Sequence, residues 1–223
     1  MKQHVLITGA SKGIGFALTK LFLEKGFAVT AASRRIQYAD LQYSDFHSLA
    51  LDLSDPSSIK RSVGEIKEKG IQFDILIHNA GVGPDLNAVK PDTTTYHETF
   101  AVNTEGTVFF KEAMLPFIKK GGKIINISSK MGSVALCTGT DSPAYRMSKA
   151  ALNMYTRILA EKYRGTFLVA ALHPGWVRTT LSPTNIHGRL SPEQSAQGIY
   201  EFVNSDFETD TFWNVETGDF CEW

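Results

Sequence analysis

The chain has 223 residues with 23 basic and 23 acidic side chains, so it carries no formal net charge at pH 7. This balance gives no support for a nucleic-acid partner, and no window holds the roughly 18 consecutive apolar residues of a membrane span. Cys137 and Cys221 are the only cysteines, too few for a disulfide framework or a cysteine metal cluster. We therefore expect two reduced thiols in one cytoplasmic domain of residues 1–223, without a signal peptide.

Short apolar runs recur at regular intervals along the chain, and most are β-branched and followed by turn residues. Such runs are typical of strands that are covered on both faces. They comprise residues 5–7, 27–32, 48–53, 75–78, 123–128 and 167–172. Residues 212–215 and 220–223 are candidates for one last strand.

Segments with helical spacing lie between these runs. Residues 14–25 end at Gly26, residues 57–69 start after a proline and end at Gly70, and residues 145–163 end near Gly165. Glycine is a common helix stop, and proline is favoured in the first turn. Alternating strands and helices predict a Rossmann-like α/β fold, a doubly wound parallel sheet in three layers within a single domain.

The segment T-G-A-S-K-G-I-G at positions 8–15 lies between the first strand and the first helix. Its glycines let the backbone turn tightly, and the helix N-terminus behind them offers free N–H groups to a phosphate. The spacing differs from G-x-G-x-x-G, and Lys12 precedes Gly13 instead of following a final glycine, so this is no P-loop. The context favours a nucleotide site over a purely structural turn.

The segment at 8–15 resembles the cofactor signature of the short-chain dehydrogenase/reductase family. Six further matches follow in the family's order: L-D-L at 51–53, N-A-G at 79–81, Asn103, I-S-S at 127–129, Y-R-M-S-K at 145–149 and P-G-W-V-R-T at 174–179. The phrasing is most similar to the carbonyl-reductase-like branch that includes the C-factor and sniffer proteins. The resemblance covers nearly the whole chain and implies an oxidoreductase that transfers a hydride between a nicotinamide cofactor and a carbonyl or alcohol.

The second strand is followed by Ser33-Arg34-Arg35, where an NAD-binding chain has an acid. A guanidinium suits a phosphate, and Lys12 could reach the same group. We therefore expect NADP(H) to be preferred over NAD(H). The alternative is that both arginines are solvated surface charges.

The resemblance also implies a set of cofactor contacts. Asp52 and Leu53 would contact the adenine, the segment 79–81 would line the ribose, and the segment 174–179 would hold the carboxamide. The full set is Gly9, Ser11, Lys12, Gly13, Ile14, Gly15, Ser33, Arg34, Asp52, Leu53, Asn79, Ala80, Gly81, Tyr145, Lys149, Pro174, Gly175, Val177 and Thr179. His78 replaces the family's usual asparagine, and we interpret it and His173 as packed strand-end residues.

Tyr145 and Lys149 are four residues apart and so share one face of a helix. A nearby cation favours the phenolate, so we expect a lowered pKa for Tyr145. By resemblance, Tyr145 is the catalytic acid/base, Lys149 tunes it and holds the ribose, and Ser129 hydrogen-bonds the substrate oxygen. Asn103 resembles the residue that kinks a helix and holds a relay water, with a plain helical asparagine as the alternative.

The spacing from Ser129 to Tyr145 is longer than is usual in the family. The extra residues lie in the loop 133–142, which we expect to border the pocket. This departure leaves open whether Ser128 or Ser129 contacts the substrate, since neighbours at a strand end point opposite ways.

The segment 180–189 takes the family's substrate-loop position and is short and polar. We therefore expect a small aldehyde or ketone as substrate, with its identity and the direction of reaction left open. An NADP(H)-binding regulatory or signalling protein is the main alternative, and a sugar-nucleotide epimerase would need a second lobe. No motif suggests a metal.

A homodimer or homotetramer is implied by analogy, because family members commonly pair through the helix that carries the tyrosine and its predecessor. Within that helix we assign Ala151, Met154, Ile158 and Leu159 to the face that suits the core.

Overall fold

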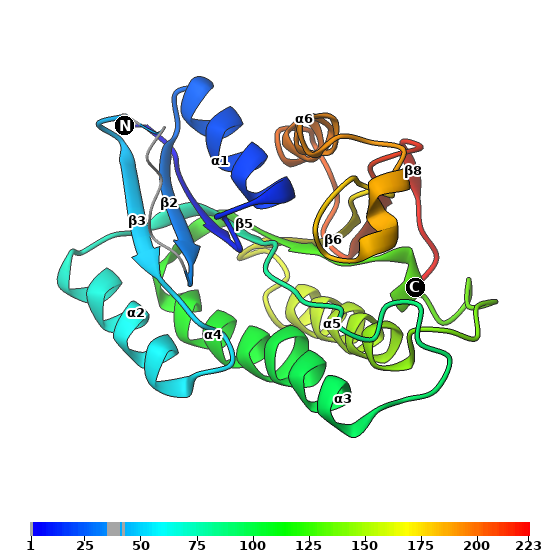
Figure 1. Cartoon of the computed structure of the whole chain (residues 1–223). Helices are drawn as coiled ribbons and strands as arrows, with labels where there is room; N and C mark the ends of the chain where they lie inside the picture. The colour runs from blue at the N-terminus through cyan, green and yellow to red at the C-terminus, as the bar shows by residue number, and fades with distance from the viewer. Residues whose placement is uncertain (1, 35–40, 42) are drawn as a thin grey trace.

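Eight strands form one sheet in the computed structural model, which describes residues 2–34, 41 and 43–223 (Figure 1). The spatial order is β3-β2-β1-β4-β5-β6-β7-β8, with β1 to β7 parallel and β8 antiparallel to β7. The strands are β1 (His4–Thr8), β2 (Ala28–Ser33), β3 (Phe46–Ala50), β4 (Phe73–His78), β5 (Ile118–Ile127), β6 (Leu168–His173), β7 (Thr211–Asn214) and β8 (Asp219–Phe220).

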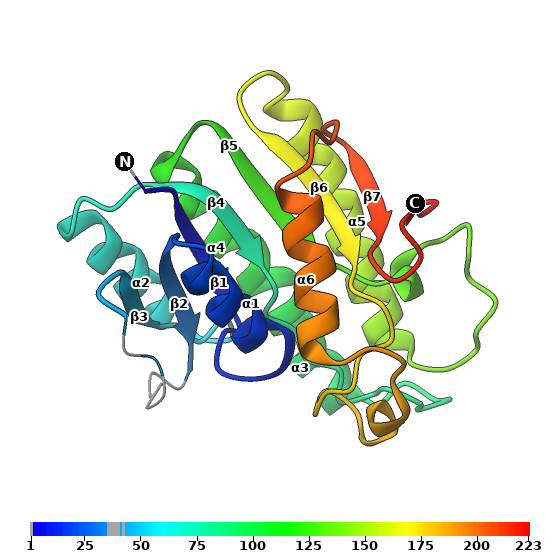
Figure 2. The same cartoon turned by 90° about the horizontal axis from the view of Figure 1, so that it is seen from above.

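Helices cover both faces of this sheet. They are α1 (Gly13–Glu24), α2 (Pro56–Glu68), α3 (Thr93–Phe100), α4 (Thr107–Met114), α5 (Pro143–Lys162) and α6 (Pro192–Val203), with short turns η1 (Ala101–Gly106), η2 (Leu115–Phe117), η3 (Lys130–Gly132) and η4 (Pro183–His187). Helices α1 and α6 lie on one face, and α2, α4 and α5 lie on the other (Figures 1 and 2). The predicted three-layer, Rossmann-like sheet is confirmed.

The strand residues alternate between two cores, which explains why the strand runs are apolar throughout. Val5 and Ile7 pack into the core beneath α1 and α6, and Leu6 packs into the core beneath α2, α4 and α5. All three side chains are fully buried. A strand covered on both faces cannot show the alternation of polar and apolar residues that marks a half-exposed sheet.

Several predicted boundaries differ from the structure; β5, for example, starts at Ile118 and not at residue 123. The third strand ends at Ala50 rather than at residue 53, because Leu51 and Leu53 are buried beyond the strand end and continue the apolar run. The last segments form two strands instead of one, with β7 and β8 pairing as a short antiparallel unit.

The face of α5 that packs against the sheet was also predicted incorrectly. Met154 and Ile158 are 61% and 52% exposed, whereas Asn153 is buried. The Asn153 side-chain oxygen accepts a hydrogen bond from Ser128 Oγ, whereas its Nδ2 is buried without a hydrogen-bond partner among the described residues. Two of the apolar residues assigned to the core face therefore point to solvent.

The strand order reverses beside β1, which pairs with β2 on one side and with β4 on the other. Chain segments leave the carboxyl ends of these strands in opposite directions, and this opens a crevice where parallel sheets bind ligands. Figure 2 shows the strand arrows running toward this edge. Most of the predicted site residues after β1, β4, β5 and β6 lie here.

Candidate active site

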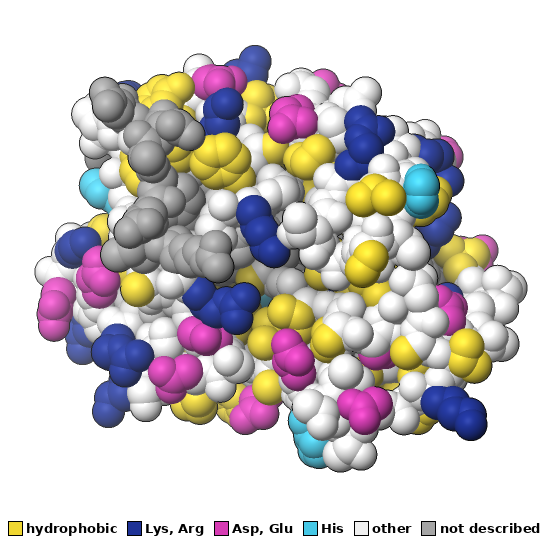
Figure 3. Space-filling view, viewed as in Figure 1, with side chains coloured by type: hydrophobic (Ala, Val, Ile, Leu, Met, Phe, Trp, Pro, Cys, Tyr) yellow, Lys and Arg dark blue, Asp and Glu magenta, His cyan; other side chains and the backbone are white. Residues whose placement is uncertain are grey.

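A cleft of about 890 Å³ opens at the carboxyl ends of the central strands. Figure 3 shows this side of the molecule, with Lys and Arg side chains beside a hollow near its middle. Most of the predicted cofactor contacts line the cleft: Gly9, Ser11, Lys12, Gly13, Ile14, Ser33, Arg34, Asp52, Leu53, Asn79, Ala80, Gly81, Tyr145, Lys149, Pro174 and Thr179. Gly15, Gly175 and Val177 do not.

The glycines after β1 are required by close backbone contacts. Gly9 has φ +66°, and a Cβ there would lie 2.8 Å from Ala80 Cα. A Cβ on Gly15 would collide with the Gly9 carbonyl oxygen, so Gly15 serves the packing of α1 on the loop and not the cleft. Gly13 has φ +55°, a conformation that side chains rarely adopt. The loop therefore offers bare backbone to a ligand.

The N-terminus of α1 faces this loop without a side-chain cap, since its N-cap residue Lys12 makes none. Uncapped N–H groups and the positive end of the helix dipole suit a phosphate. Lys12 Nζ instead donates to Thr180 Oγ1 at 2.8 Å, across the cleft. The glycine cradle, the open helix terminus and the lysine together fit a dinucleotide phosphate.

The ends of β1 and β4 are held together by Thr8 and Asn79. Thr8 Oγ1 accepts from the backbone N–H groups of Asn79 at 3.1 Å and Ala80 at 3.0 Å. Asn79 Nδ2 donates to the Thr8 carbonyl oxygen at 3.0 Å. His78 is fully buried beside them and contacts Thr107 Oγ1 at 2.8 Å, so it is packed, as predicted.

The end of the cleft near β2 carries Arg34 and Asp52. Asp52 Oδ1 accepts from Ser54 N at 2.9 Å and from Ser54 Oγ at 2.7 Å. The Ser54 hydrogen bonds lower the pKa of Asp52, with a smaller contribution from the positive charge of Arg34. Arg34 therefore lies near the residues predicted to contact the adenine. Arg35, the second predicted arginine, lies outside the described residues.

The segment after β6 contacts the cleft through Pro174 and Thr179. Gly175 has φ +88°, and a Cβ there would lie 2.6 Å from Leu190 Cδ1. Val177 is buried and bridges to Leu190. These two residues thus anchor the loop to the segment before α6, while their neighbours face the cleft.

Tyr145 and Lys149 lie together at the bottom of the cleft, 7% and 4% exposed. Lys149 Nζ donates to the Ile127 carbonyl oxygen at 3.0 Å. Burial lowers the pKa of Lys149 to about 8 and raises the pKa of Tyr145 to about 12. The predicted lowering of the Tyr145 pKa is therefore wrong for the protein alone, because desolvation of the phenolate raises this pKa and the negative charge of Asp85 raises it further.

Two neighbouring serines after β5 point to different partners. A hydrogen bond with the Ser129 side chain favours the phenolate of Tyr145 and partly offsets the rise in its pKa. Ser128 lines the cleft, whereas Ser129 is not among its lining residues, and the Ser128 hydroxyl donates to Asn153 Oδ1 at 2.5 Å. Ser129 is thus the serine that affects the pKa of Tyr145, and its hydroxyl also accepts from Met131 N at 3.1 Å.

Asn103 lies in η1, a π-helical turn that interrupts the run from α3 to α4. Its amide accepts from Val82 N at 2.8 Å and donates to the Val82 carbonyl oxygen at 2.8 Å and to Ser148 Oγ at 3.1 Å. The residue thus joins the loop after β4 to α5 below Tyr145. The π-helical turn interrupts the α-helical pattern at Asn103, and the kink and the relay water stay predictions.

Sequence analysis missed two buried charged groups near this site. Asp85 follows β4 and accepts hydrogen bonds from the first turn of α5. Lys111 on α4 is fully buried, and its Nζ donates to Asn126 Oδ1 at 2.7 Å. Neither Asp85 nor Lys111 stands in a sequence motif that could have marked it.

The loop 133–142, which was expected to border the pocket, does not line the cleft and packs beside the start of α5.

Within the part of the chain that the structure describes, no group of three or more His, Cys, Asp or Glu side chains could hold a metal ion. Among the same residues, no helix combines the length and apolar character of a membrane span.

The chain is similar to known proteins along most of its length. A family model described as short chain dehydrogenase matches residues 3–189. C-signal of Myxococcus xanthus is 36% identical over 142 residues, 56% of this chain and 86% of that protein. The NADPH-bound carbonyl reductase from chicken fatty liver is 29% identical, with a TM-score of 0.88 over 100% of this chain and 94% of that one.

The carbonyl reductase Sniffer of D. melanogaster is 26% identical, with a TM-score of 0.87 over 100% of both chains. These likenesses confirm the resemblance to the carbonyl-reductase-like branch that the motifs predicted. The family match, the sheet order and the cleft at its switch point agree, and the chain belongs to the short-chain dehydrogenase family of oxidoreductases.

Proposed function

We propose that the protein reduces a small aldehyde or ketone to the alcohol with NADPH, or catalyses the reverse oxidation with NADP⁺. The observation that carries this proposal is the buried Tyr145, whose pKa the Ser129 side chain lowers and which lies four residues before Lys149, in a large cleft. The similarity to the NADPH-bound carbonyl reductase from chicken fatty liver supports the same activity.

The cleft has the features that an NADP(H) molecule needs. The bare backbone at Gly9 and Gly13 and the open N-terminus of α1 would hold the pyrophosphate. Lys12 and Arg34 would bind the additional 2′-phosphate. Among the described residues that line the cleft near β2, Asp52 is the only acid that could repel this phosphate. When bound, the reduced nicotinamide would supply a hydride to the carbonyl carbon.

The protein side chains would donate the proton and stabilise the negative charge that develops during the reaction. With a pKa of about 12, Tyr145 holds its proton at neutral pH and can donate it to the carbonyl oxygen. The Ser129 hydroxyl would hydrogen-bond the same oxygen as negative charge develops there. The ammonium of Lys149 would stabilise the phenolate left on Tyr145, which then takes a proton from water.

The wall of the cleft beside Tyr145 supports a small substrate. Val82, Gly83, Pro84 and Leu181 line it there and offer mostly apolar surface. A Cβ on Gly83 would lie 3.1 Å from Tyr145 Cδ2, so the wall comes close to the phenol ring. This favours compact carbonyl compounds over large ones.

The test is NADPH oxidation with a panel of small aldehydes and ketones, with NADH as the cofactor control. We expect turnover in the wild type and its loss in Tyr145→Phe, while NADPH binding stays within about twofold of the wild type. Equal turnover in Tyr145→Phe would contradict the proposed role of the tyrosine.

The second candidate is a regulatory protein that binds NADP(H) with little or no turnover, and the 36% identity to C-signal favours it. A sensor needs no proton donor, so the buried tyrosine and its serine partner argue for catalysis first. Tight NADPH binding without turnover on any tested carbonyl would put this candidate ahead.

We also propose that two copies pair through an α4–α5 patch, defined as Phe109, Met147, Met154 and Ile158. These side chains are 63%, 51%, 61% and 52% exposed. The two helices lie side by side, since Tyr155 Oη donates to Glu112 Oε1 at 2.9 Å. Exposed apolar side chains gathered on adjacent helices are typical of a protein interface.

A further inference from the structure

Helix α5, which carries Tyr145, begins without the side-chain cap that α2, α3 and α6 have. The N-cap residues Asp55, Asp92 and Ser191 each accept a backbone hydrogen bond in the first turn of α2, α3 and α6. The N-cap residue of α5 is Ser142, which is left-handed at φ 57° and makes no such bond. The first N–H groups of α5 therefore need another acceptor.

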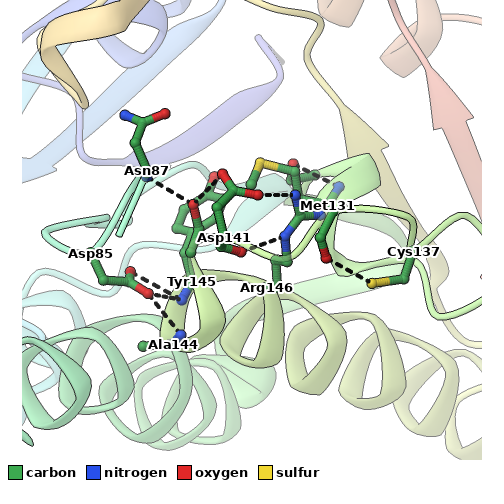
Figure 4. Close-up of polar contacts among 11 residues, drawn as sticks. Asp85, Asn87, Met131, Cys137, Asp141, Ala144, Tyr145 and Arg146 are labelled. Atoms are coloured by element: carbon green, nitrogen blue, oxygen red, sulfur yellow. Dashed lines mark hydrogen bonds and ion pairs between the residues drawn. The ribbon is translucent and has the colours of Figure 1, made fainter. Parts of the chain in front are cut away.

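Asp85, far away in the sequence, is that acceptor. Its carboxylate accepts from Ala144 N at 2.7 Å and from Tyr145 N at 3.1 and 3.2 Å (Figure 4). These are the second and third residues of α5, the positions that an N-cap side chain normally satisfies. Asp85 is only 2% exposed, and none of the ion pairs between described residues includes it.

The contact extends over the whole segment that follows Asp85. Asn87 N donates to Ser142 Oγ at 2.9 Å, and Ser142 N donates to the Ala88 carbonyl oxygen at 2.7 Å. The segment 85–88 thus holds the segment 142–145 from outside the helix, and Figure 4 shows the Asp85 carboxylate and the Asn87 backbone N–H facing it. This fixes the backbone of Tyr145 relative to the loop after β4, whose Gly83 and Pro84 line the cleft.

We propose that Asp85 is a positioning residue for the reaction: it fixes the start of α5 and thereby aims the phenol of Tyr145 at the substrate oxygen beside Ser129. The inference rests on the proposed function of Tyr145. The Asp85 carboxylate is buried and accepts a hydrogen bond from the backbone N–H of Tyr145 itself. It therefore fixes the position from which the Tyr145 ring extends. A displacement of about 1 Å at a reacting group costs about 100-fold in rate.

The experiment compares Asp85→Ala and Asp85→Asn with Asp55→Ala. Asp55 is a matched control, because its carboxylate caps α2 at Ser57 N and it does not line the cleft. Three quantities are measured: kcat for carbonyl reduction, Kd for NADPH, and amide hydrogen exchange of a peptide covering residues 142–149.

We expect kcat to fall about 10- to 100-fold in Asp85→Ala, with Kd for NADPH within about twofold of the wild type and exchange at 142–149 about tenfold faster. Asp85→Asn keeps one acceptor oxygen, so it should recover part of kcat and of the protection from exchange. Asp55→Ala should change neither kcat nor exchange at 142–149.

Two results would overturn the proposal: unchanged exchange in both Asp85 variants, or a kcat within about twofold of the wild type in Asp85→Ala. Failure of the proposed function gives a different pattern, in which Tyr145→Phe keeps its turnover or the wild type has none. The exchange measurement then still decides whether Asp85 fixes the start of α5. If Asp85→Ala does not fold, Asp85→Leu, which also lacks both acceptor oxygens, replaces it under the same two criteria.

Discussion

Lys149 Nζ lies 5.7 Å from the centroid of the Tyr145 ring and is held there by the Ile127 carbonyl oxygen. The two groups are buried together, and burial moves their pKa values in opposite directions, to about 8 for Lys149 and about 12 for Tyr145. Near pH 8 the lysine therefore changes its charge, while the tyrosine keeps its proton.

The pH dependence of the reaction follows from this order. We expect kcat/KM for carbonyl reduction to fall as the pH rises above about 8, because neutral Lys149 no longer stabilises the phenolate that proton donation leaves. Lys149→Arg stays charged, so its profile should stay flat to about pH 9.5 even if its rate is lower. A wild-type profile that stays flat through pH 9 would contradict this assignment.

The cofactor preference should depend on Lys12 and Arg34. We expect the double variant Lys12→Ala/Arg34→Ala to weaken NADPH binding by about 10- to 100-fold, since each loses a charge-assisted contact to the 2′-phosphate. NADH binding should change by less than about twofold. Fluorescence titration of both cofactors measures this, with Lys20→Ala, an exposed lysine of α1, as the matched control. Equal losses for NADPH and NADH would show that these residues do not read the phosphate.

The fully buried Lys111 should cost stability at neutral pH. Burial lowers its pKa well below the ordinary 10.5, and the positive charge of Lys149 lowers it further. The unfolded chain then binds the Lys111 proton more tightly than the folded chain does. The free energy of unfolding of the wild type therefore rises with pH, through this group, up to about pH 10.5. We expect Lys111→Met to raise the free energy of unfolding by about 1–2 kcal/mol at pH 7, with a smaller gain at pH 10.

Urea unfolding at both pH values measures the effect of Lys111→Met. The variant also leaves Asn126 Oδ1 without its lysine donor, which costs about 1 kcal/mol and reduces the gain. A loss of stability at pH 7 would show that the hydrogen bond outweighs the desolvation of the ammonium.

His173 at the end of β6 should make the fold sensitive to acid. It is 6% exposed, and neither ring nitrogen has a hydrogen-bond partner among the described residues. Burial lowers its pKa from 6.5 to about 4. The unfolded chain therefore takes up this proton first as the pH falls, and up to about 3 kcal/mol of stability is lost between pH 6.5 and 4.

His173→Leu keeps the packing and removes this titration. We expect its unfolding free energy to fall less steeply than that of the wild type between pH 6.5 and 4, as measured by urea unfolding across that range. Parallel curves for the two proteins would assign the acid sensitivity to other groups, of which the partly buried His4, also with a pKa of about 4, is the first to examine.

Pairing through the α4–α5 patch should be abolished by a charge at its centre. We expect Met154→Glu to give a monomer at micromolar concentration, because a carboxylate buried at an interface costs several kcal/mol. Val89→Glu is the control, as Val89 is 72% exposed and lies outside the patch. Light scattering after gel filtration measures the mass, and a wild-type monomer would remove the pairing proposal.

Local patterns were sufficient to predict the order of strands and helices, since each apolar run and each glycine stop acts within a few residues. The motif residues likewise predicted which side chains would meet in the cleft. Asp85 was not predictable, because its partners lie about 60 residues further along and no motif joins them. The outward face of α5 was misassigned because exposed apolar residues such as Met154 follow the same helical spacing as core residues.

The pKa of Tyr145 shows a second limit of sequence analysis. The spacing to Lys149 gives the sign of one interaction, but the desolvation of the phenolate depends on how deeply the fold buries the ring. Only the packed structure fixes that depth, and it reverses the predicted direction.

The π-helical turn η1 sets the rotational phase between α3 and α4. Each residue turns a helix by about 100°, and a π-turn holds one residue more than an α-helical turn would. Deleting one residue from 101–106 would rotate α4 against the sheet and carry the fully buried Phe110 and Met114 toward solvent. A surface loop tolerates insertions and deletions, but this turn does not, because its length fixes the rotation of α4 relative to α3.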